Sequence, residues 1–485
     1  MRPILCPCFM LFIMVMMNIV NVNAQNIGIG TATPTQKLDV NGGIHIGNTA
    51  VANAGTIRWN TVKSDFEGYN GNTWVSLTDG KGKWGDQSSY SNENTASQFG
   101  LIDAYTPGSE LGNAMAGDGD WIAAGAYRDA SPGSDTKWHT GSVRLMHRVN
   151  GVWRLEHSMY DPDAVNSDFF GFSVDMSATH VITGASNANM VGSDDQGKAY
   201  IYTYDINNTT LQATLLASDA QTYDYFGLAV GISGDDAVVG APFNDILGVN
   251  NMGRAYVYKR SGNTWPEVQL LTPADGATDD RFGNAIAVWG EYLAISSPYK
   301  TYNGLSNAGK VYVYRKNGPS WILIQQFNSP APNYGEVFGY RLVIKDNILL
   351  VSATDFIGGS YDSTGSVYIY SINNNTVSYE ATLHASDGQN GDAFGSSIDY
   401  HNGVIIVGAN RAVVRSLNRH GKAYIFKEIN GNWQEEAILT SSTNEAQITF
   451  GTSVTLVQDY AVVGAPFADF SNRVDNGRLF FFKQY

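Results

Sequence analysis

The stretch 226–259, FGLAVGISGDDAVVGAPFNDILGVNNMGRAYVYK, decides the fold because its landmarks return along the chain. A small-residue cluster, here Gly240-Ala241-Pro242, begins 14 residues after the opening Phe, and a glycine, here Gly253, stands 27 residues after it. The opening Phe-Gly occurs at six positions spaced 56 residues apart, namely Phe170, Phe226, Phe282, Phe338, Phe394 and Phe450. A fixed period of this kind predicts a repeat architecture.

A seventh, degenerate copy lies upstream of these six. Leu111-Gly112 replaces Phe-Gly, Gly125-Ala126-Tyr127 follows at the usual distance, and the closing glycine, Gly141, arrives three residues late. That insertion accounts for the interval of 59 residues between Leu111 and Phe170. The repeats therefore start near 111, 170, 226, 282, 338, 394 and 450.

Each copy contains four short segments rich in Val, Ile, Tyr and Leu, which in the third copy are 229–232, 237–240, 254–259 and 268–271. Gly234-Asp235 predicts a tight turn between the first two strands. Hairpin turns between strands three and four are predicted at Asn150-Gly151, Ser261-Gly262, Asn317-Gly318 and Asn430-Gly431. A tryptophan follows each of these turns, and we expect it to fill the space between sheets: Trp153, Trp265, Trp321 and Trp433.

A four-stranded sheet has two apolar faces and cannot bury them alone, so copies must stack radially. The expected fold is all-β, a seven-bladed β-propeller of four-stranded antiparallel blades at about 95–485, preceded by a short β-rich stalk. The last copy reaches only its third strand, 478–483. Since 95–103 aligns with the fourth strand of the second copy, we expect it to complete the seventh blade and close the ring.

Phe-Gly followed by Gly-Ala-Pro at this spacing resembles the FG-GAP repeat of integrin α-subunit propellers and of many secreted bacterial proteins. The resemblance covers 95–485 and implies extracellular adhesion or recognition. In the integrin-type repeat a D-x-D-x-D-G loop between strands one and two holds calcium. Here that connection is too short for the six to eight oxygens that calcium needs, and even Asp118-Gly119-Asp120 is interpreted as a hairpin turn. We expect no metal and no cofactor.

Pairs of aspartates five residues apart lie between the predicted blades and end two residues before the Phe. Four copies carry such a pair: Asp163 and Asp168, Asp219 and Asp224, Asp275 and Asp280, Asp387 and Asp392. Paired carboxylates are compatible with metal binding. Capping of backbone N–H groups in turns is favoured, because the pairs recur with the architecture and not at a single place.

The N-terminus carries Arg2, an apolar stretch and a small-residue end at Ala24, which is the pattern of a signal peptide at 1–24. Both cysteines, Cys6 and Cys8, lie within it, so a mature chain beginning at Gln25 has none. Residues 25–79 are similar to the stalks of phage tail-fibre-like and secreted trimeric fibre proteins, which implies a possible homotrimer. A small monomeric β-appendage is the alternative. Residues 80–94 are the expected linker.

The formal net charge of −15 makes nucleic acid an improbable partner, since its binding requires a basic surface. No later apolar run approaches the length of a membrane helix, so membrane insertion is not expected. The sequence lacks H-E-x-x-H, G-x-S-x-G and P-loop motifs, and its eight histidines are scattered. We therefore expect a secreted or cell-surface adhesion or recognition protein that is not catalytic.

The connections from strand two to strand three are long and differ between copies, and they should converge on one face of the ring. That face is the predicted binding site for extracellular glycan or protein ligands. Its candidate residues are Tyr127, Trp138, Asp194, Asp195, Asp245, Tyr299, Tyr361, Arg411 and Asp475. Solvated connector loops remain an equally good interpretation of any one of them. A glycan-active enzyme and a structural spacer of an envelope or matrix remain the alternative functions.

Overall fold

In the computed structural model, the chain divides into two units, Met1–Lys81 and Gly82–Tyr485. Each unit is considered by itself. The residues described are 27–29, 38–40, 57–60, 65–69, 74–76, 108–130, 138–149, 151–189, 194–354, 356–357, 360–361, 364–469 and 474–483.

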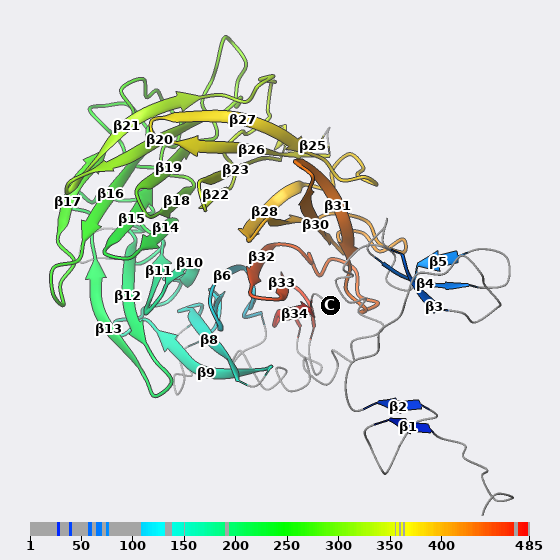
Figure 1. Ribbon diagram of the computed structural model, residues 1–485. Coiled ribbons are helices and arrows are strands. Elements are labelled where there is room, and N and C mark those ends of the chain that lie inside the picture. Colours follow the sequence, from blue (N-terminus) through cyan, green and yellow to red (C-terminus); the bar gives the residue numbers. More distant parts are fainter. Residues whose placement is uncertain are drawn as a thin grey trace, which may run out of the picture. The chain divides into compact units, whose positions relative to one another are not determined.

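The second unit is a seven-bladed β-propeller in which consecutive strands pair antiparallel within each blade (Figure 1). Blade one contains β6 (Ala114–Asp118), β7 (Trp121–Ala126), β8 (Ser142–Val149) and β9 (Val152–Tyr160). Blade two contains β10 (Phe170–Ser177), β11 (His180–Ala185), β12 (Lys198–Tyr204) and β13 (Thr209–Leu215). Blade three contains β14 (Ala229–Ser233), β15 (Asp236–Ala241), β16 (Arg254–Lys259) and β17 (Glu267–Leu271).

Blades four to seven repeat the arrangement. Blade four contains β18 (Ile286–Trp289), β19 (Tyr292–Ser297), β20 (Lys310–Asn317) and β21 (Ser320–Phe327). Blade five contains β22 (Leu342–Lys345), β23 (Ile348–Ala353), β26 (Ser366–Asn373) and β27 (Thr376–Leu383), with a small hairpin, β24 (Phe356–Ile357) and β25 (Ser360–Tyr361), between its second and third strands. Blade six contains β28 (Phe394–His401), β29 (Val404–Ala409), β30 (Lys422–Ile429) and β31 (Asn432–Leu439). Blade seven contains β32 (Ser453–Val457), β33 (Tyr460–Ala465) and β34 (Arg478–Lys483).

The strands predicted for the third copy are confirmed to within one residue. Register Ser233↔Asp236 leaves Gly234-Asp235 as the turn, as expected. Two of the predicted hairpin turns are wrong by one residue, because Ser261 pairs with Thr264 and Asn317 pairs with Ser320. The turn pairs are therefore Gly262-Asn263 and Gly318-Pro319, in which glycine takes the first central position with φ of 62° and 61°.

The blades form a closed ring around a central axis (Figure 1). The first strand of every blade lies beside the first strand of the next, and β32 lies beside β6. Leu111 bridges Gly477 in parallel, and Ser453 Oγ donates to the Gly112 carbonyl oxygen at 2.6 Å. The ring is thus closed between blades seven and one by described residues alone. The predicted closing strand 95–103 lies outside the described residues.

The repeated Phe is the main contact between neighbouring blades. Phe226 is fully buried among Ile182 and Ile201 of blade two and Val239 of its own blade, with its ring 5.2 Å from that of Tyr256. The tryptophans behave as predicted: Trp153, Trp265 and Trp321 are buried, and Trp433 packs against the core between blades five and six. Burial of both faces of each sheet explains why the fold is a ring of copies.

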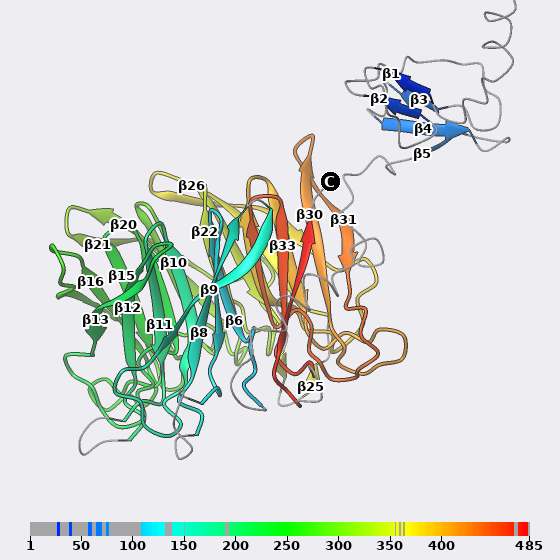
Figure 2. The ribbon, with the colours of Figure 1, turned by 90° about the horizontal axis from the view of Figure 1, so that it is seen from below.

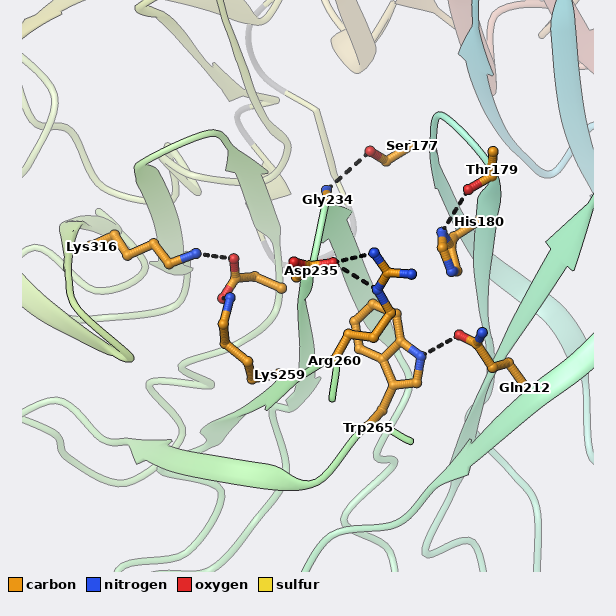
Figure 3. Close-up of polar contacts among 11 residues, drawn as sticks. Ser177, Thr179, His180, Gln212, Gly234, Asp235, Lys259, Arg260, Trp265 and Lys316 are labelled. Atoms are coloured by element: carbon orange, nitrogen blue, oxygen red, sulfur yellow. Dashed lines mark hydrogen bonds and ion pairs between the residues drawn. The ribbon is translucent and has the colours of Figure 1, made fainter. Parts of the chain in front are cut away.

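Polar contacts also join the blades at the end where strands one and two turn (Figure 3). Ser177 Oγ of blade two accepts the Gly234 N–H at 3.2 Å, and Trp265 Nε1 donates to Gln212 Oε1 at 2.6 Å. Lys316 of blade four pairs with the buried Asp236 of blade three. We call this end of the propeller the turn face.

The first unit contains two small sheets among its described residues. β1 (Ile27–Ile29) pairs in parallel with β2 (Leu38–Val40), and β3 (Ile57–Asn60), β4 (Asp65–Tyr69) and β5 (Trp74–Ser76) form an antiparallel sheet. The predicted signal peptide 1–24 and linker 80–94 lie outside the described residues. No segment that the structure describes forms a helix of the length and hydropathy that a bilayer crossing requires.

Candidate functional site

The connections between strands two and three are hydrogen-bonded to the segment that precedes the next repeat Phe. Between blades three and four, main-chain N–H groups of Asp279, Arg281 and Phe282 donate to the carbonyl oxygens of Asn250, Asn251 and Met252 at 3.0, 3.1 and 2.9 Å. The same set of three bonds joins blades two and three. We call the surface formed by these connections and segments the loop face; the loop that carries β25 lies at the lower end of the blades in Figure 2.

The residue before each repeat Phe has a left-handed backbone conformation. All seven are residues other than glycine, and their φ angles lie between 53° and 60°. They are Glu110, Phe169, Tyr225, Arg281, Val337, Ala393 and Thr449. Because this conformation is disfavoured for L-residues, the surrounding main-chain bonds must impose it. One backbone conformation thus recurs with seven different residues, of which Glu110, Val337 and Ala393 are buried and the other four are half-buried on the loop face.

Two of the predicted site residues come from blade one. Tyr127 is half-buried and packs edge-to-face against Phe169 and Phe172, with centroid distances of 5.3 and 5.5 Å. Burial and a hydrogen bond to Glu110 raise the pKa of Tyr127. Trp138 is 67% exposed, while its main-chain N–H donates to Asn166 Oδ1 at 2.9 Å. Trp138 is therefore available to a ligand, and Tyr127 is packed as part of the face.

The four predicted aspartates mainly shape the loops. Asp245 is exposed, and its Oδ1 accepts the Asn251 N–H at 2.8 Å. Asp194, Asp195 and Asp475 provide carbonyl oxygens for the bonds between blades. Burial raises the pKa of Asp195 and of Asp475. These residues lie on the predicted face, where their backbones contribute to its rigidity.

The remaining three predicted residues come from blades four, five and six. Tyr299 is half-buried, and the Arg281 Cζ lies 4.5 Å from its ring centroid. Arg411 is half-buried and donates its main-chain N–H to the Asp392 carbonyl oxygen at 3.2 Å. Tyr361 pairs with Phe356 in the β24–β25 hairpin. The fold thus brings the nine residues to connections of the same kind, but spreads them over several blades.

Several aromatic residues of the loop face escaped prediction. Phe169, Phe172, Tyr225, Phe243 and Tyr340 are all half-buried. Each directly follows a landmark of the repeat or stands close to its Phe, so in the sequence these residues look like structural parts of the repeat. A sign of a surface role was present, because aromatic residues occupy these positions in some copies and small residues in others.

The inter-blade aspartates cap turns, as expected. The second member of three pairs accepts the N–H of the residue three positions earlier: Asp224 from Gln221, Asp280 from Ala277 and Asp392 from Gln389, at 2.8, 2.7 and 3.0 Å. Asp168 does the same for Val165 at 2.8 Å. The capping interpretation is confirmed for these four residues.

The first members bind side chains of the third strand. Asp275 Oδ1 accepts the Tyr312 hydroxyl at 2.8 Å, and Asp275 Oδ2 lies 2.8 Å from Lys310 Nζ. Burial opposes ionisation here, but these hydrogen bonds and Lys300 hold the pKa of Asp275 below its ordinary value. Asp163 is the exception, because its own N–H donates to Asp161.

A family model described as FG-GAP repeat matches 153–202, 209–258, 265–314, 377–426 and 433–482, which together exceed half of the chain. The chain belongs to the FG-GAP repeat family. Each match begins at the end of one blade and runs through three strands of the next, so the FG-GAP unit spans the contact between blades that contains the buried Phe.

Strands one and two of the FG-GAP blades are joined by short turns. In blade one Asp118 pairs with Trp121, and Asp120 forms an ion pair with Arg148 at 2.8 Å. The hairpin interpretation of Asp118-Gly119-Asp120 is confirmed. Within the described ranges, no group of three or more His, Cys, Asp or Glu side chains is arranged to hold a metal ion.

A second polar group lies on the innermost strands of the FG-GAP propeller. Asp175 of β10 accepts the N–H groups of Ile232 and Met176, both at 2.8 Å. Asp399 of β28 binds Lys345 Nζ at 2.8 Å. Burial raises the pKa of Asp175 to about 7, although its backbone hydrogen bonds and Lys345 oppose the rise. Asp175 is therefore a pH-sensitive element of the ring.

Asp175→Asn should change how stability depends on pH. The folded pKa of Asp175 is about 7, above the ordinary aspartate value of 3.8, so between these pH values the folded state holds a proton that the unfolded state has lost. The contribution of this group to wild-type stability therefore falls as pH rises from 3.8 to 7. We expect the difference in unfolding free energy, variant minus wild type, to be about 1–2 kcal/mol more favourable to the variant at pH 8 than at pH 4, after discounting for partial water access. Urea unfolding across this pH range measures it; a pH-independent difference would contradict the assignment.

Proposed function

We propose that the protein is a secreted, non-catalytic recognition protein that binds extracellular glycans or proteins through its loop face. The observation that supports this most directly is the left-handed position before each repeat Phe and before Leu111. Its backbone conformation is the same in every blade, and in four blades its side chain is partly exposed: Phe169, Tyr225, Arg281 and Thr449. Rigid backbone with variable side chains is the usual arrangement of binding surfaces built on loops. Membership of the FG-GAP family agrees with a recognition role.

The tips of several loops support the same proposal. Ile246 and Val249 exchange two main-chain hydrogen bonds, at 3.1 and 2.9 Å, and Tyr302 pairs with Leu305 in the same way. Leu247, at the first of these turns, is fully exposed, and Trp138 is 67% exposed. A large apolar side chain held out on an ordered turn, as Leu247 is, loses little conformational freedom on binding, which favours contact with a partner.

We further propose that residues 1–24 direct export and that 25–79 form the stalk. The short strands described in this unit provide little core, so association of three chains would stabilise them and would also add avidity for a repetitive surface. A glycan-active enzyme and an envelope or matrix spacer are the competing functions. Turnover of a bound glycan would favour the first, and ordered self-assembly without a ligand would favour the second.

Binding of the purified full mature chain to arrays of glycans and matrix proteins, with and without chelator, tests the proposal. Two triple variants are compared. The loop-tip variant replaces exposed side chains of the loop face (Trp138→Ser, Leu247→Ser, Tyr302→Ser). The rim variant is the control and replaces exposed side chains of fourth strands (Leu211→Ser, Ile322→Ser, Tyr379→Ser). We expect the loop-tip variant to lose about tenfold or more in affinity, because each buried apolar contact contributes about 1–2 kcal/mol.

The rim variant should bind like wild type, and chelator should have no effect. Equal loss of binding in both variants would contradict a site on the loop face. A folded wild type that binds nothing on either array would overturn the recognition proposal in favour of the spacer.

A further inference from the structure

Aromatic and arginine side chains of successive copies lie along the loop face from blade three to blade five. We call this set the aromatic arc, and it comprises Tyr225, Phe243, Arg281, Tyr299, Tyr340 and Arg341. Tyr225 meets Phe243 edge-to-face at 5.1 Å, and the Arg281 Cζ lies 4.5 Å from the ring centroids of both Phe243 and Tyr299. Arg341 Cζ lies 4.5 Å from the Tyr340 ring centroid. The arc combines four aromatic rings with two planar cations.

The arc is assembled from landmarks of three successive copies. Tyr225 and Arg281 are the left-handed residues before Phe226 and Phe282, with φ of 53° and 55°. Phe243 and Tyr299 follow the small-residue clusters of blades three and four, so the Arg281 guanidinium lies beside one ring from each blade. These ring contacts and the main-chain bonds between blades therefore hold Tyr225 and Arg281 in place before any ligand arrives.

Among the residues that the structure describes, the two arginines of the arc form no ion pair with a carboxylate. Most cations of the propeller do: ion pairs are formed by Arg128, Arg144, Arg148, Arg254, Arg260, Lys259, Lys300, Lys310, Arg315, Lys316, Lys345, Lys422 and Lys483. By contrast, within the part of the chain that the structure describes, no Asp or Glu oxygen lies within 4.0 Å of the Arg281 or Arg341 nitrogens. In a chain of net charge −15, two such cations on the loop face mark a place for an anion.

We propose that the aromatic arc binds an acidic glycan, a chain of sugar rings that carries carboxylate or sulfate groups. This rests on the proposed function and specifies its ligand class. Aromatic rings pack against the apolar faces of sugars, while the planar guanidinium forms paired hydrogen bonds with a carboxylate or a sulfate. Because Phe243 and Tyr299 hold the Arg281 guanidinium in place, it loses little conformational freedom when it pairs with such an anion.

Single-stranded nucleic acid also combines stacking with negative charge, but the balance of charges disfavours it. Its backbone needs a positively charged groove that follows many phosphates, whereas the arc supplies two cations on a strongly acidic chain. A glycan with spaced charges needs no more than the arc provides.

The test uses the full mature chain and four immobilised probes: polygalacturonate, dextran sulfate, neutral dextran and oligo-dT. Wild type should bind one or both acidic polysaccharides, and more weakly as salt is raised. Arg281→Gln with Arg341→Gln should reduce that affinity at least about tenfold, because charge-assisted pairs are lost. Arg341 is exposed, so Arg341→Gln alone should reduce affinity without affecting folding.

Arg260→Gln is the matched control. Arg260 carries the same charge on the turn face, where it pairs with Asp235 at 2.5 Å, and its replacement should leave binding unchanged. Equal binding to neutral dextran, preference for oligo-dT, or indifference to both arc variants would overturn the arc proposal alone, provided that the chain still binds a ligand through its loop tips. A chain that binds no probe and no array ligand would overturn the proposed function as well.

Discussion

Phe282→Ala is expected to lower the free energy of unfolding of the propeller by about 3–5 kcal/mol. Phe282 is fully buried between blades three and four, where it packs with Val257 and Leu271 on one side and Ile295 and Tyr312 on the other. Loss of the ring would leave a cavity that the two sheets could close only by moving together. Their spacing is fixed by neighbouring blades in a closed ring, so little relaxation is available.

Urea unfolding followed by tryptophan fluorescence measures this loss. Leu247→Ala is the control: it also removes a large apolar side chain, but Leu247 is fully exposed at a loop tip, and its replacement should leave the unfolding midpoint unchanged. A Phe282 variant within 1 kcal/mol of wild type would mean that the repeat Phe is not a principal contact between blades.

Sequence reasoning succeeded where one physical constraint acts in every copy. The Phe, the small-residue cluster and the closing glycine meet the same neighbours in each blade, so their recurrence reveals the strands and the ring. The Gly240 position illustrates this: a β-carbon there would lie 2.1 Å from the Gly283 carbonyl oxygen of the next blade. Contacts of this kind tolerate few residue types and are therefore visible in the sequence.

The aromatic arc could not be predicted from the sequence, because its positions do not restrict the residue type in every copy. At positions such as Arg281 the repeat fixes the backbone conformation but not the type of residue. Arg281 and Val337, for example, occupy equivalent positions with φ of 55° and 56°. No residue type predicts that conformation, because the hydrogen bonds that impose it come from another blade. The prediction therefore located the loop face and Tyr299 on it, but missed Arg281 beside Tyr299.

Gly253→Ala and Gly248→Ala should differ sharply although both glycines belong to the same loop. Their φ angles are 83° and 84°, so an alanine suffers similar backbone strain, about 1 kcal/mol, at either position. A β-carbon on Gly248 meets nothing within 4 Å, whereas one on Gly253 would lie 2.2 Å from the Phe282 carbonyl oxygen and 2.5 Å from its nitrogen. Only Gly253→Ala must push the next blade away.

That displacement should add about 2–3 kcal/mol to the strain, giving a total loss of about 3–4 kcal/mol for Gly253→Ala against about 1 kcal/mol for Gly248→Ala. It also pulls apart the Phe282 N–H···O bond to Met252, 2.9 Å long in the wild type, and with it the support of Arg281. Unfolding of both variants, beside hydrogen exchange at the Phe282 amide, measures the two effects. Equal losses would show that backbone strain alone makes the closing glycine necessary; a larger loss with faster exchange at Phe282 would show that it is necessary because the next blade passes so close.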